Sequence, residues 1–207
     1  MPSSVFFRHA GLFVMPGFLN RSECLDVQAR MRGAQPEKAL IAKKSGGGRA
    51  ETLVDENWRK VASINVDKST ATWVKERLLE VRPKLEEHFK IPLTGCQGPD
   101  FLNYGENSFY KRHKDVDSDA PPAIIHRKVS AVIFLNAVSN TPASGCYTGG
   151  SLAFFGLLPG PEWMECAFPL EAEAGLLIAF PSDMAHEVQP VTSGHRFTIA
   201  GWFTDHG

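Results

Sequence analysis

The sequence predicts an α+β fold in which a double-sheet jelly roll packs against helices that come first in the chain. Two patterns support this prediction. Before residue 98, apolar residues recur twice at helical spacing, whereas after it short apolar or alternating runs are separated by turns containing Gly and Pro. Many short strands without intervening helices are typical of an antiparallel sandwich or barrel. The 207 residues, 43% of them hydrophobic, are enough for one full core, so we expect a single domain over residues 1–207.

The first apolar segment, residues 5–16, is interrupted by Arg8, His9 and Pro16, and we expect it to form an edge strand. It lacks the order of charged, apolar and then small residues that marks a signal peptide. No run in the chain approaches the ~20 apolar residues that a membrane-spanning helix needs. We therefore expect no membrane partner.

Two helices are expected before the strands begin. Asn20 followed by Glu23 resembles a capping box, and the helix that starts there should end at Gly33. The second helix, from about 69 to 89, carries an apolar stripe at helical spacing. Pro83 lies inside this second pattern and should kink the helix or end it early.

The segment 35–52 is rich in Gly, Lys and Ala, and we expect it to be a mobile loop and a candidate lid. Residues from about 1 to 97 are therefore expected to supply helical support and this flexible loop, and residues from about 98 to 207 the jelly-roll catalytic core. The strands expected in the core are 101–104, 128–135, 151–155, 175–180, 186–188 and 196–203.

Composition and motifs exclude several classes of function. A net charge of −1 argues against a strongly basic nucleic-acid binder, so we expect no nucleic-acid partner. The four cysteines are widely scattered, which favours reduced thiols and a cytoplasmic location. Residues 46–50 lack the Gly-Lys-Ser/Thr ending of a phosphate loop. A zinc-protease helix is excluded because Pro190 stands where its second histidine must be. A serine-hydrolase nucleophile elbow is disfavoured because Ala153 replaces its last glycine.

A His-x-Asp pair, His113 and Asp115, is the first indication of a metal site. In an extended chain, residues two apart point to the same side, so both side chains can reach one point. Taken alone, the His-x-Asp motif is explained equally well by a hydrogen-bonded His–Asp pair at a strand end. His186 adds a second imidazole after a later apolar strand and a turn. Two imidazoles and one carboxylate form the facial triad that suits non-haem Fe(II) and leaves positions for substrates and dioxygen.

Arg196 extends this metal site toward a second ligand. It follows His186 across a turn, and if the two strands pair antiparallel, Arg196 returns beside His186. Arg196 and Thr198 then share one face of their strand, and Phe197 and Ile199 the other. A guanidinium in an apolar pocket is costly unless it meets a carboxylate, which a dicarboxylic keto acid chelating the metal would supply. The alternative is an arginine at a strand start that faces water.

From Phe101 to Phe203 the chain resembles the Fe(II)- and 2-oxoglutarate-dependent dioxygenases, in particular the prolyl-4-hydroxylase-like branch with its small bacterial members. The resemblance lies in the order of its motifs, each of which is weak alone. They are Tyr-Gly, Phe-Tyr-x-x-His-x-Asp, the strand from Arg127 to Asn136, Gly-Gly-Ser-Leu at 149–152, Phe-Pro-Ser at 180–182, His-Glu-Val at 186–188, Pro-Val at 190–191, Gly194, Arg196 and Trp202-Phe203.

The resemblance implies a double-stranded β-helix core, Fe(II) held by His113, Asp115 and His186, and Arg196 on the far carboxylate of 2-oxoglutarate. It also implies O2 as cosubstrate, ascorbate as a candidate reductant, and a role for the Tyr104 hydroxyl in cosubstrate binding. The oxygen-sensing relatives have a second tyrosine where this chain has Phe134. Thr198 and Ser130 are the candidates to take over that contact.

The function implied is hydroxylation of an unactivated C–H bond, with a prolyl residue of a protein or peptide as the favoured substrate and succinate and CO2 as products. Residues 35–52 and 136–147 are candidate substrate-covering segments. Three alternatives are a biosynthetic oxygenase acting on a free amino acid or other small molecule, a non-catalytic jelly-roll binding module, and a cupin-like isomerase. The isomerase would need the three metal ligands but not Arg196, and the binding module would have no use for all four residues together.

Overall fold

The computed structural model describes residues 4–39, 41–44, 50–53 and 55–206. The helices of these residues are α1 (Ser4–His9), α2 (Arg21–Gly33), α3 (Lys68–Phe89) and the short 3₁₀ helix η1 (Pro161–Trp163). The strands are β1 (Phe13–Met15), β2 (Pro36–Lys38), β3 (Ile41–Lys44), β4 (Ala50–Leu53), β5 (Arg59–Lys60), β6 (Ala62–Ile64), β7 (Gly95–Tyr104), β8 (Phe109–His113), β9 (Arg127–Phe134), β10 (Tyr147–Gly149), β11 (Leu152–Phe155), β12 (Ala167–Leu170), β13 (Leu177–Pro181), β14 (His186–Val188), β15 (Val191–Gly194) and β16 (Arg196–Thr204).

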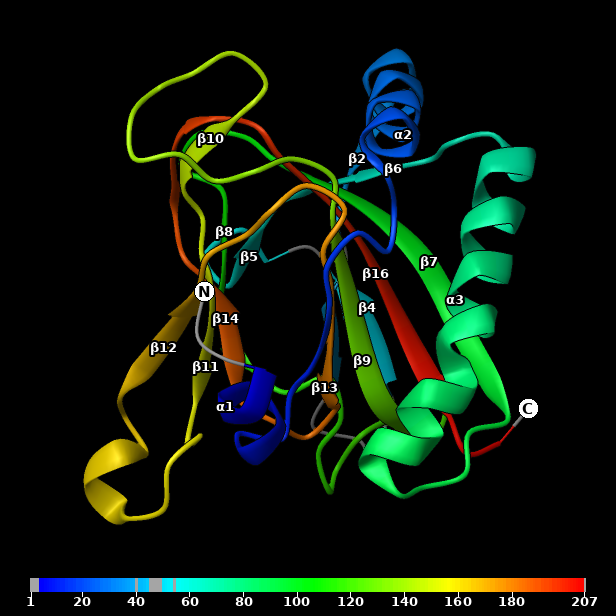
Figure 1. Cartoon of the computed structure of the whole chain (residues 1–207), viewed down its shortest axis with the longest axis vertical. Helices are drawn as coiled ribbons and strands as arrows, with labels where there is room; N and C mark the ends of the chain where they lie inside the picture. Colours follow the sequence, from blue (N-terminus) through cyan, green and yellow to red (C-terminus); the bar gives the residue numbers. More distant parts are fainter. Residues whose placement is uncertain (1–3, 40, 45–49, 54, 207) are drawn as a thin grey trace.

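Two antiparallel sheets form the body of the molecule (Figure 1). The seven-stranded sheet has the order β1-β13-β9-β16-β7-β6-β2, and the five-stranded sheet has the order β12-β11-β14-β8-β5. One buried cluster draws side chains from both sheets, including Phe134 and Phe180 from the first and Leu152 and Phe154 from the second. The apolar faces of the two sheets therefore pack on each other, which confirms the predicted jelly roll and α+β fold.

The two long helices cover the outer face of the seven-stranded sheet, on the right in Figure 1. Their apolar stripes meet the side chains that β16 and β9 direct away from the other sheet, and these include Phe197, Ile199 and Ile133. The predicted capping box at Asn20 is present, with the Asn20 side chain and the Glu23 side chain each bonding the other's backbone N–H. This packing holds the seven-stranded sheet rigid behind the strands that line the interior.

The second helix does not end at Pro83, although a proline there was expected to kink or shorten it. Helix α3 continues from Lys68 to Phe89, and Pro83 is exposed on its outer side. On the inner side, Val81 and Leu85 are buried against the sheet. Burial on both sides of the proline offsets the one lost backbone hydrogen bond.

Two expectations about the first 60 residues are wrong in part. The segment 5–16 is not one edge strand, because α1 precedes the three-residue strand β1, which does lie at the edge of its sheet beside β13. The segment 35–52 is not simply a loop: β2 pairs with β6, and β3 pairs with β4 in a hairpin. Its Lys, Ala and Gly residues lack the alternation that marks a strand, so pairing there was not predictable. Residues 40 and 45–49 of the expected lid lie outside the described residues.

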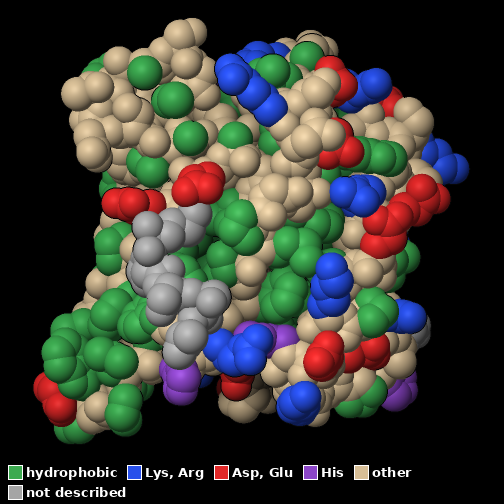
Figure 2. Space-filling model, in the orientation of Figure 1, with side chains coloured by type: hydrophobic (Ala, Val, Ile, Leu, Met, Phe, Trp, Pro, Cys, Tyr) green, Lys and Arg blue, Asp and Glu red, His purple; other side chains and the backbone are tan. Residues whose placement is uncertain are grey.

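All six strands expected after residue 98 are present, as parts of β7, β9, β11, β13, β14 and β16. Strand β12 and the short strands β10 and β15 were not expected. The segment between β11 and β12, at the lower left of Figures 1 and 2, displays hydrophobic side chains, among which Trp163 and Met164 are exposed. No helix within the described ranges is long and apolar enough to span a membrane.

Candidate active site

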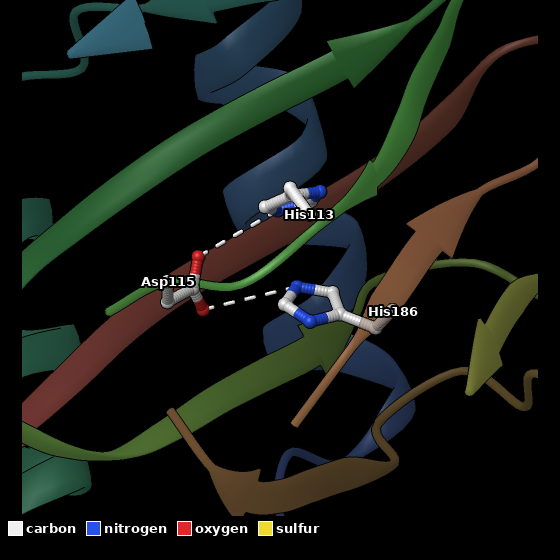
Figure 3. Close-up of side chains that lie close together, drawn as sticks. All are labelled: His113, Asp115 and His186. Atoms are coloured by element: carbon white, nitrogen blue, oxygen red, sulfur yellow. Dashed lines mark ion pairs between the residues drawn. The ribbon is translucent and has the colours of Figure 1, made fainter. Parts of the chain in front are cut away.

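Strand pairing brings the two predicted histidine ligands together. His113 is the last residue of β8 and His186 the first residue of β14, and these neighbouring antiparallel strands place the two residues directly opposite each other. Their imidazole centroids lie 4.2 Å apart. Asp115 follows β8 by two residues, and its backbone N–H donates to the carbonyl of Ser182 at 2.9 Å. Residues separated by about 70 positions therefore meet at one end of the five-stranded sheet (Figure 3).

The three side chains point at a common centre. His113 Nε2 lies 3.7 Å from Asp115 Oδ1, and His186 Nε2 lies 3.8 Å from Asp115 Oδ2. These separations are too long for good hydrogen bonds, yet the ligand atoms of the three residues all lie within 4.8 Å of one another. Three donors at such spacing suit the coordination of one ion better than they suit a hydrogen-bonded pair.

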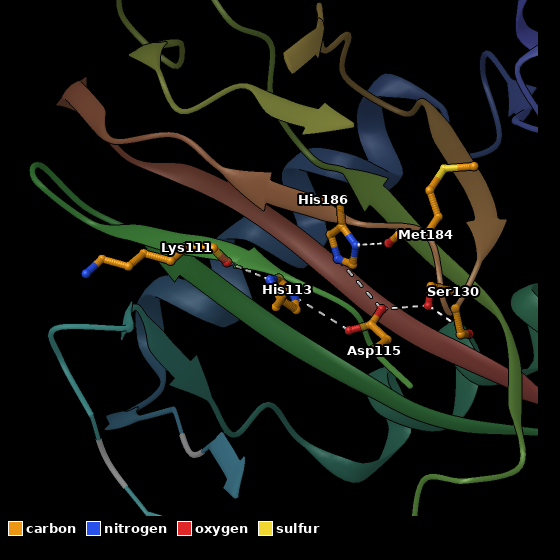
Figure 4. A network of polar contacts seen from close by, with 7 residues as sticks. Lys111, His113, Asp115, Ser130, Met184 and His186 are labelled. Atoms are coloured by element: carbon orange, nitrogen blue, oxygen red, sulfur yellow. Dashed lines mark hydrogen bonds and ion pairs between the residues drawn. The ribbon is translucent and has the colours of Figure 1, made fainter. Parts of the chain in front are cut away.

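Backbone carbonyls orient both imidazoles, as Figure 4 shows. His113 Nδ1 lies 2.8 Å from the carbonyl oxygen of Lys111, and His186 Nδ1 lies 2.9 Å from that of Met184. A carbonyl only accepts, so each Nδ1 carries the hydrogen and each Nε2 presents a lone pair to the centre. Burial, together with the charge of His113, lowers the pKa of His186 to about 4, which keeps this imidazole neutral and able to ligate at neutral pH.

Asp115 is held as a carboxylate by its neighbours. Ser130 Oγ donates to Asp115 Oδ2 at 2.6 Å (Figure 4). Ser182 Oγ lies 3.0 Å from Ser130 Oγ. Burial alone would raise the pKa of Asp115, but the neighbouring histidines and the Ser130 hydroxyl outweigh it and hold that pKa well below its usual range. Ser130, suggested by the sequence as a cosubstrate contact, instead fixes the orientation of this carboxylate.

Arg196 lies across the interior from the His–Asp–His centre, on the other sheet. The expectation that its strand pairs with the strand of His186 is wrong: β15 pairs with β10, and β16 pairs with β7 and β9. The residues between them carry the chain from one sheet to the other. Arg196 and His186 nevertheless line the same pocket, together with the predicted residues Tyr104 and Thr198. The predicted division of the Arg196 strand into two faces is confirmed, because Phe197 and Ile199 lie in the outer cluster.

The guanidinium of Arg196 is almost fully buried and has one unpaired edge. Its Nη1 donates to Thr198 Oγ1 at 3.3 Å, while its Nε and Nη2 find no hydrogen-bond partner within the described residues. The rings of Tyr104 and Phe134 lie 4.9 Å and 5.1 Å from its central carbon. A buried cation with two unused donors on one edge fits the two oxygens of a carboxylate.

Three comparisons with known proteins agree on the family. Residues 99–204, about half of the chain, match the family model described as the 2OG-Fe(II) oxygenase superfamily. The chain belongs to the 2OG-Fe(II) oxygenase superfamily.

Among curated relatives, a PKHD-type hydroxylase of Hyphomonas neptunium is 26% identical to this oxygenase-family chain, with 92% of the chain and 77% of the relative aligned. A PKHD-type hydroxylase of Acaryochloris marina is 33% identical over 102 residues, which are 49% of this chain and 39% of that relative. The chain thus spans about two fifths of the length of this second relative.

Solved structures show the same fold at low sequence identity. A Pseudomonas putida prolyl-4-hydroxylase superimposes with a TM-score of 0.69 at 23% identity, covering 95% of this chain and 94% of the other. A Trichoplax adhaerens prolyl hydroxylase, solved in complex with a peptide fragment of the hypoxia inducible factor oxygen degradation domain, superimposes with a TM-score of 0.63 at 19% identity. This superposition covers 96% of the present chain and 86% of the Trichoplax adhaerens chain.

The family implies Fe(II), 2-oxoglutarate and O2, and the residues of this oxygenase-family chain fit all three. Two imidazoles and one carboxylate match Fe(II), and they leave coordination positions for other ligands. The unpaired edge of Arg196 matches a carboxylate at the other side of the pocket. The described residues therefore offer a donor set for the metal and a separate one for a dicarboxylate.

Tyr147 is a residue that the sequence analysis missed. It is fully buried at the start of β10, and its hydroxyl makes no hydrogen bond of good geometry in the described part of the chain. Burial raises the pKa of Tyr147, and the charge and hydrogen bonding of the nearby Arg196 oppose that rise. In the sequence, only its position two residues before the Gly-Gly pair could have drawn attention to it, since β10 is too short to show a periodic pattern.

A second His–Asp–His group lies at the surface, formed by His126, Asp205 and His206. Asp205 already pairs with Lys128 at 3.2 Å and with His126 at 3.2 Å, so its carboxylate is engaged on both oxygens. This group is more exposed than the one between the sheets, and the sequence analysis assigned no role to His206.

Proposed function

We propose that this chain is a Fe(II)- and 2-oxoglutarate-dependent dioxygenase that hydroxylates a prolyl residue of a protein or peptide and releases succinate and CO2. In this proposal His113, Asp115 and His186 hold the iron, and Arg196, Thr198 and Tyr104 bind the cosubstrate. We also propose that the chain forms a single domain over residues 1–207. Ascorbate as reductant and a cytoplasmic location stay predictions.

One observation carries the proposal. A metal-type donor set and an unpaired, buried guanidinium edge face the same pocket from opposite sheets. A cupin-like isomerase would use the first of these groups but would leave the buried charge of Arg196 without a partner, at considerable cost. A non-catalytic binding module would have no use for the two groups together. A ligand that chelates metal at one end and carries a carboxylate at the other uses both.

When bound, iron and 2-oxoglutarate together activate dioxygen, and oxidative decarboxylation of the keto acid drives the insertion of one oxygen atom into a C–H bond. The protein supplies positioning and a dry interior. Ser130 and two backbone carbonyls hold the metal-ligating side chains in place. Leu102, Val132 and Trp202 line the pocket with apolar surface and exclude water from it.

A prolyl residue as the substrate is supported by two features. First, both solved prolyl hydroxylases named above share this fold, and one of them was solved with a peptide. Second, the pocket wall includes Trp202, whose indole is stacked by the guanidinium of Arg127 at 3.9 Å, and Tyr110, which stacks on His113 with ring centroids 3.5 Å apart. Rigid aromatic walls suit an apolar five-membered ring.

The test uses the purified full chain with Fe(II), 2-oxoglutarate and oxygen, and a panel of proline-containing peptides. We expect succinate formation and a mass gain of one oxygen atom on a peptide, both lost in His186→Ala. Arg196→Met keeps much of the side-chain bulk but removes the donors, and we expect it to abolish 2-oxoglutarate turnover while leaving Mn(II) binding within about threefold of wild type. Substrate conversion that needs no 2-oxoglutarate and survives Arg196→Met would favour the isomerase class.

Free amino acids and other small molecules belong in the same panel, because a biosynthetic oxygenase is the main alternative within the class. Oxygen gain on free proline but on no peptide would replace the prolyl-peptide proposal with that alternative. Succinate no higher than in His186→Ala with every compound would count against an active oxygenase altogether.

A further inference from the structure

We propose that Tyr147 supplies a third hydrogen-bond donor for the far carboxylate of the cosubstrate, beside the unpaired edge of Arg196, and so selects a dicarboxylic keto acid. This inference rests on the proposed function and deepens it. It assigns a specificity-determining role to a residue on β10, outside both large sheets.

The guanidinium of Arg196 lies among aromatic rings and has one edge that makes no good hydrogen bond within the described residues. The rings of Tyr104 and Phe134 lie 4.9 Å and 5.1 Å from its central carbon. Its Nη1 is engaged by Thr198. The remaining donors, Nε and Nη2, lie on the same edge of the planar group, which is the geometry for a two-pronged bond to one carboxylate.

Tyr147 reaches the same place. A Cβ atom built on Gly150 would lie 3.3 Å from Arg196 Cδ and 3.3 Å from Tyr147 Cε2, so both side chains border the space that Gly150 leaves open. Both side chains are buried, and Tyr147 Oη, Arg196 Nε and Arg196 Nη2 form no hydrogen bond of good geometry among the residues described, although Arg196 lies close enough to lower the pKa of Tyr147 through its charge and hydrogen bonding. Three orphaned donors gathered in one buried spot indicate an anionic ligand with several acceptor lone pairs.

The hydroxyls of Tyr104 and Thr198 near Arg196 are already assigned to the cosubstrate in the proposed function, and the two other candidate positions offer none. Position 134 carries a phenylalanine, which covers the guanidinium but has no hydroxyl. Thr198 Oγ1 accepts from Nη1, on the edge away from the unpaired donors. Ser130 donates to Asp115 at the metal end. The hydroxyl of Tyr147 is therefore a further donor, beyond those of Tyr104 and Thr198, that the sequence analysis did not assign to this carboxylate.

The test compares wild type with Tyr147→Phe, both loaded with Mn(II) in place of Fe(II) so that no turnover occurs. Two ligands are titrated by calorimetry: 2-oxoglutarate, and 2-oxopentanoate, which has the same chain length but lacks the far carboxylate. A hydrogen bond to a charged group is worth about 10- to 100-fold in affinity. We expect Tyr147→Phe to weaken 2-oxoglutarate binding by this factor and to leave 2-oxopentanoate binding unchanged.

Thermal unfolding of the metal-free proteins adds a readout that separates binding from folding. The Tyr147 hydroxyl has no partner in the described residues, so its removal should leave the Tm equal to that of wild type or higher. Unchanged 2-oxoglutarate affinity, equal losses for both ligands, or a Tm several degrees lower would each overturn the assignment of Tyr147. If instead wild type itself does not prefer 2-oxoglutarate over 2-oxopentanoate, the proposed function fails, and this inference fails with it.

Discussion

Ser130→Ala tests whether the hydroxyl behind Asp115 positions the metal-binding carboxylate. Ser130 is 1% exposed, and its bond to Asp115 Oδ2 measures 2.6 Å, the length expected of a charge-assisted bond from a hydroxyl to a carboxylate. A hydrogen bond to a charged group contributes about 1.5–3 kcal/mol, and no water is expected to replace a donor this deeply buried. We therefore expect the free energy of unfolding of the metal-free protein to fall by about 2 kcal/mol.

The same substitution should weaken metal binding. Loss of a partner that orients a ligating side chain typically costs 10- to 100-fold in metal affinity. Asp115 keeps its backbone bond to the carbonyl of Ser182, so the carboxylate stays near the site but loses its fixed orientation. Urea unfolding measures the first effect, and competition titration with Mn(II) measures the second.

Ser182→Ala is the matched control for this substitution. Its hydroxyl lies 3.0 Å from Ser130 Oγ, whereas its contact with Asp115 is made by the backbone, which the substitution retains. We expect Ser182→Ala to cost about 1 kcal/mol of stability and less than about threefold in Mn(II) affinity. Equal metal affinities in wild type and Ser130→Ala would refute the positioning role, and so would equal losses in the two variants.

Two further predictions concern a glycine and the buried thiols. Gly150→Ala should lower the free energy of unfolding by more than the ~1–2 kcal/mol expected for an alanine in the left-handed backbone conformation, because the new Cβ would lie 2.8 Å from Val191 Cγ2. The same crowding should also weaken 2-oxoglutarate binding. Gly17→Ala, with a similar φ and no atom within 4 Å, should show the backbone cost alone in the same melting and titration experiments. Burial raises the pKa of Cys24 and Cys96 to about 11, so both thiols should resist alkylation at pH 8 until the protein unfolds. A mass-spectrometric time course of labelling measures this. Early labelling of either cysteine in the folded protein would contradict the prediction.

The metal end of the pocket was predictable from the sequence because its determinants are local. His113 and Asp115 are two residues apart, and His186 follows a clearly apolar strand and a Pro-Ser-Asp turn. What the sequence alone could not show is the register that sets His186 opposite His113, since strand pairing is a tertiary property. The role of Ser130 depends on the same tertiary packing, and the sequence analysis placed it at the wrong end of the pocket.

The cosubstrate end was harder to predict for a physical reason. Alternation along β16 correctly identified which face of that strand carries Arg196, but alternation says nothing about which strand lies next to it. A two-strand hairpin was the simplest assumption for the segment after His186, yet the chain crosses there to the opposite sheet. Tyr147 lies on a three-residue strand, too short for any periodic signal, and only its unpaired hydroxyl distinguishes it.

The division of the site between sheets has a consequence for how its parts depend on one another. The two histidines sit on β8 and β14 of the five-stranded sheet, whereas Asp115, which follows β8, is tied by Ser130 and Ser182 to β9 and to the end of β13 in the seven-stranded sheet. Arg196 belongs to that second sheet as well. The distance from the His–Asp–His group to the Arg196 guanidinium is therefore set by the packing between sheets and not by any one loop. Because packed cores resist continuous deformation, this arrangement fixes the length of the ligand that the pocket can span.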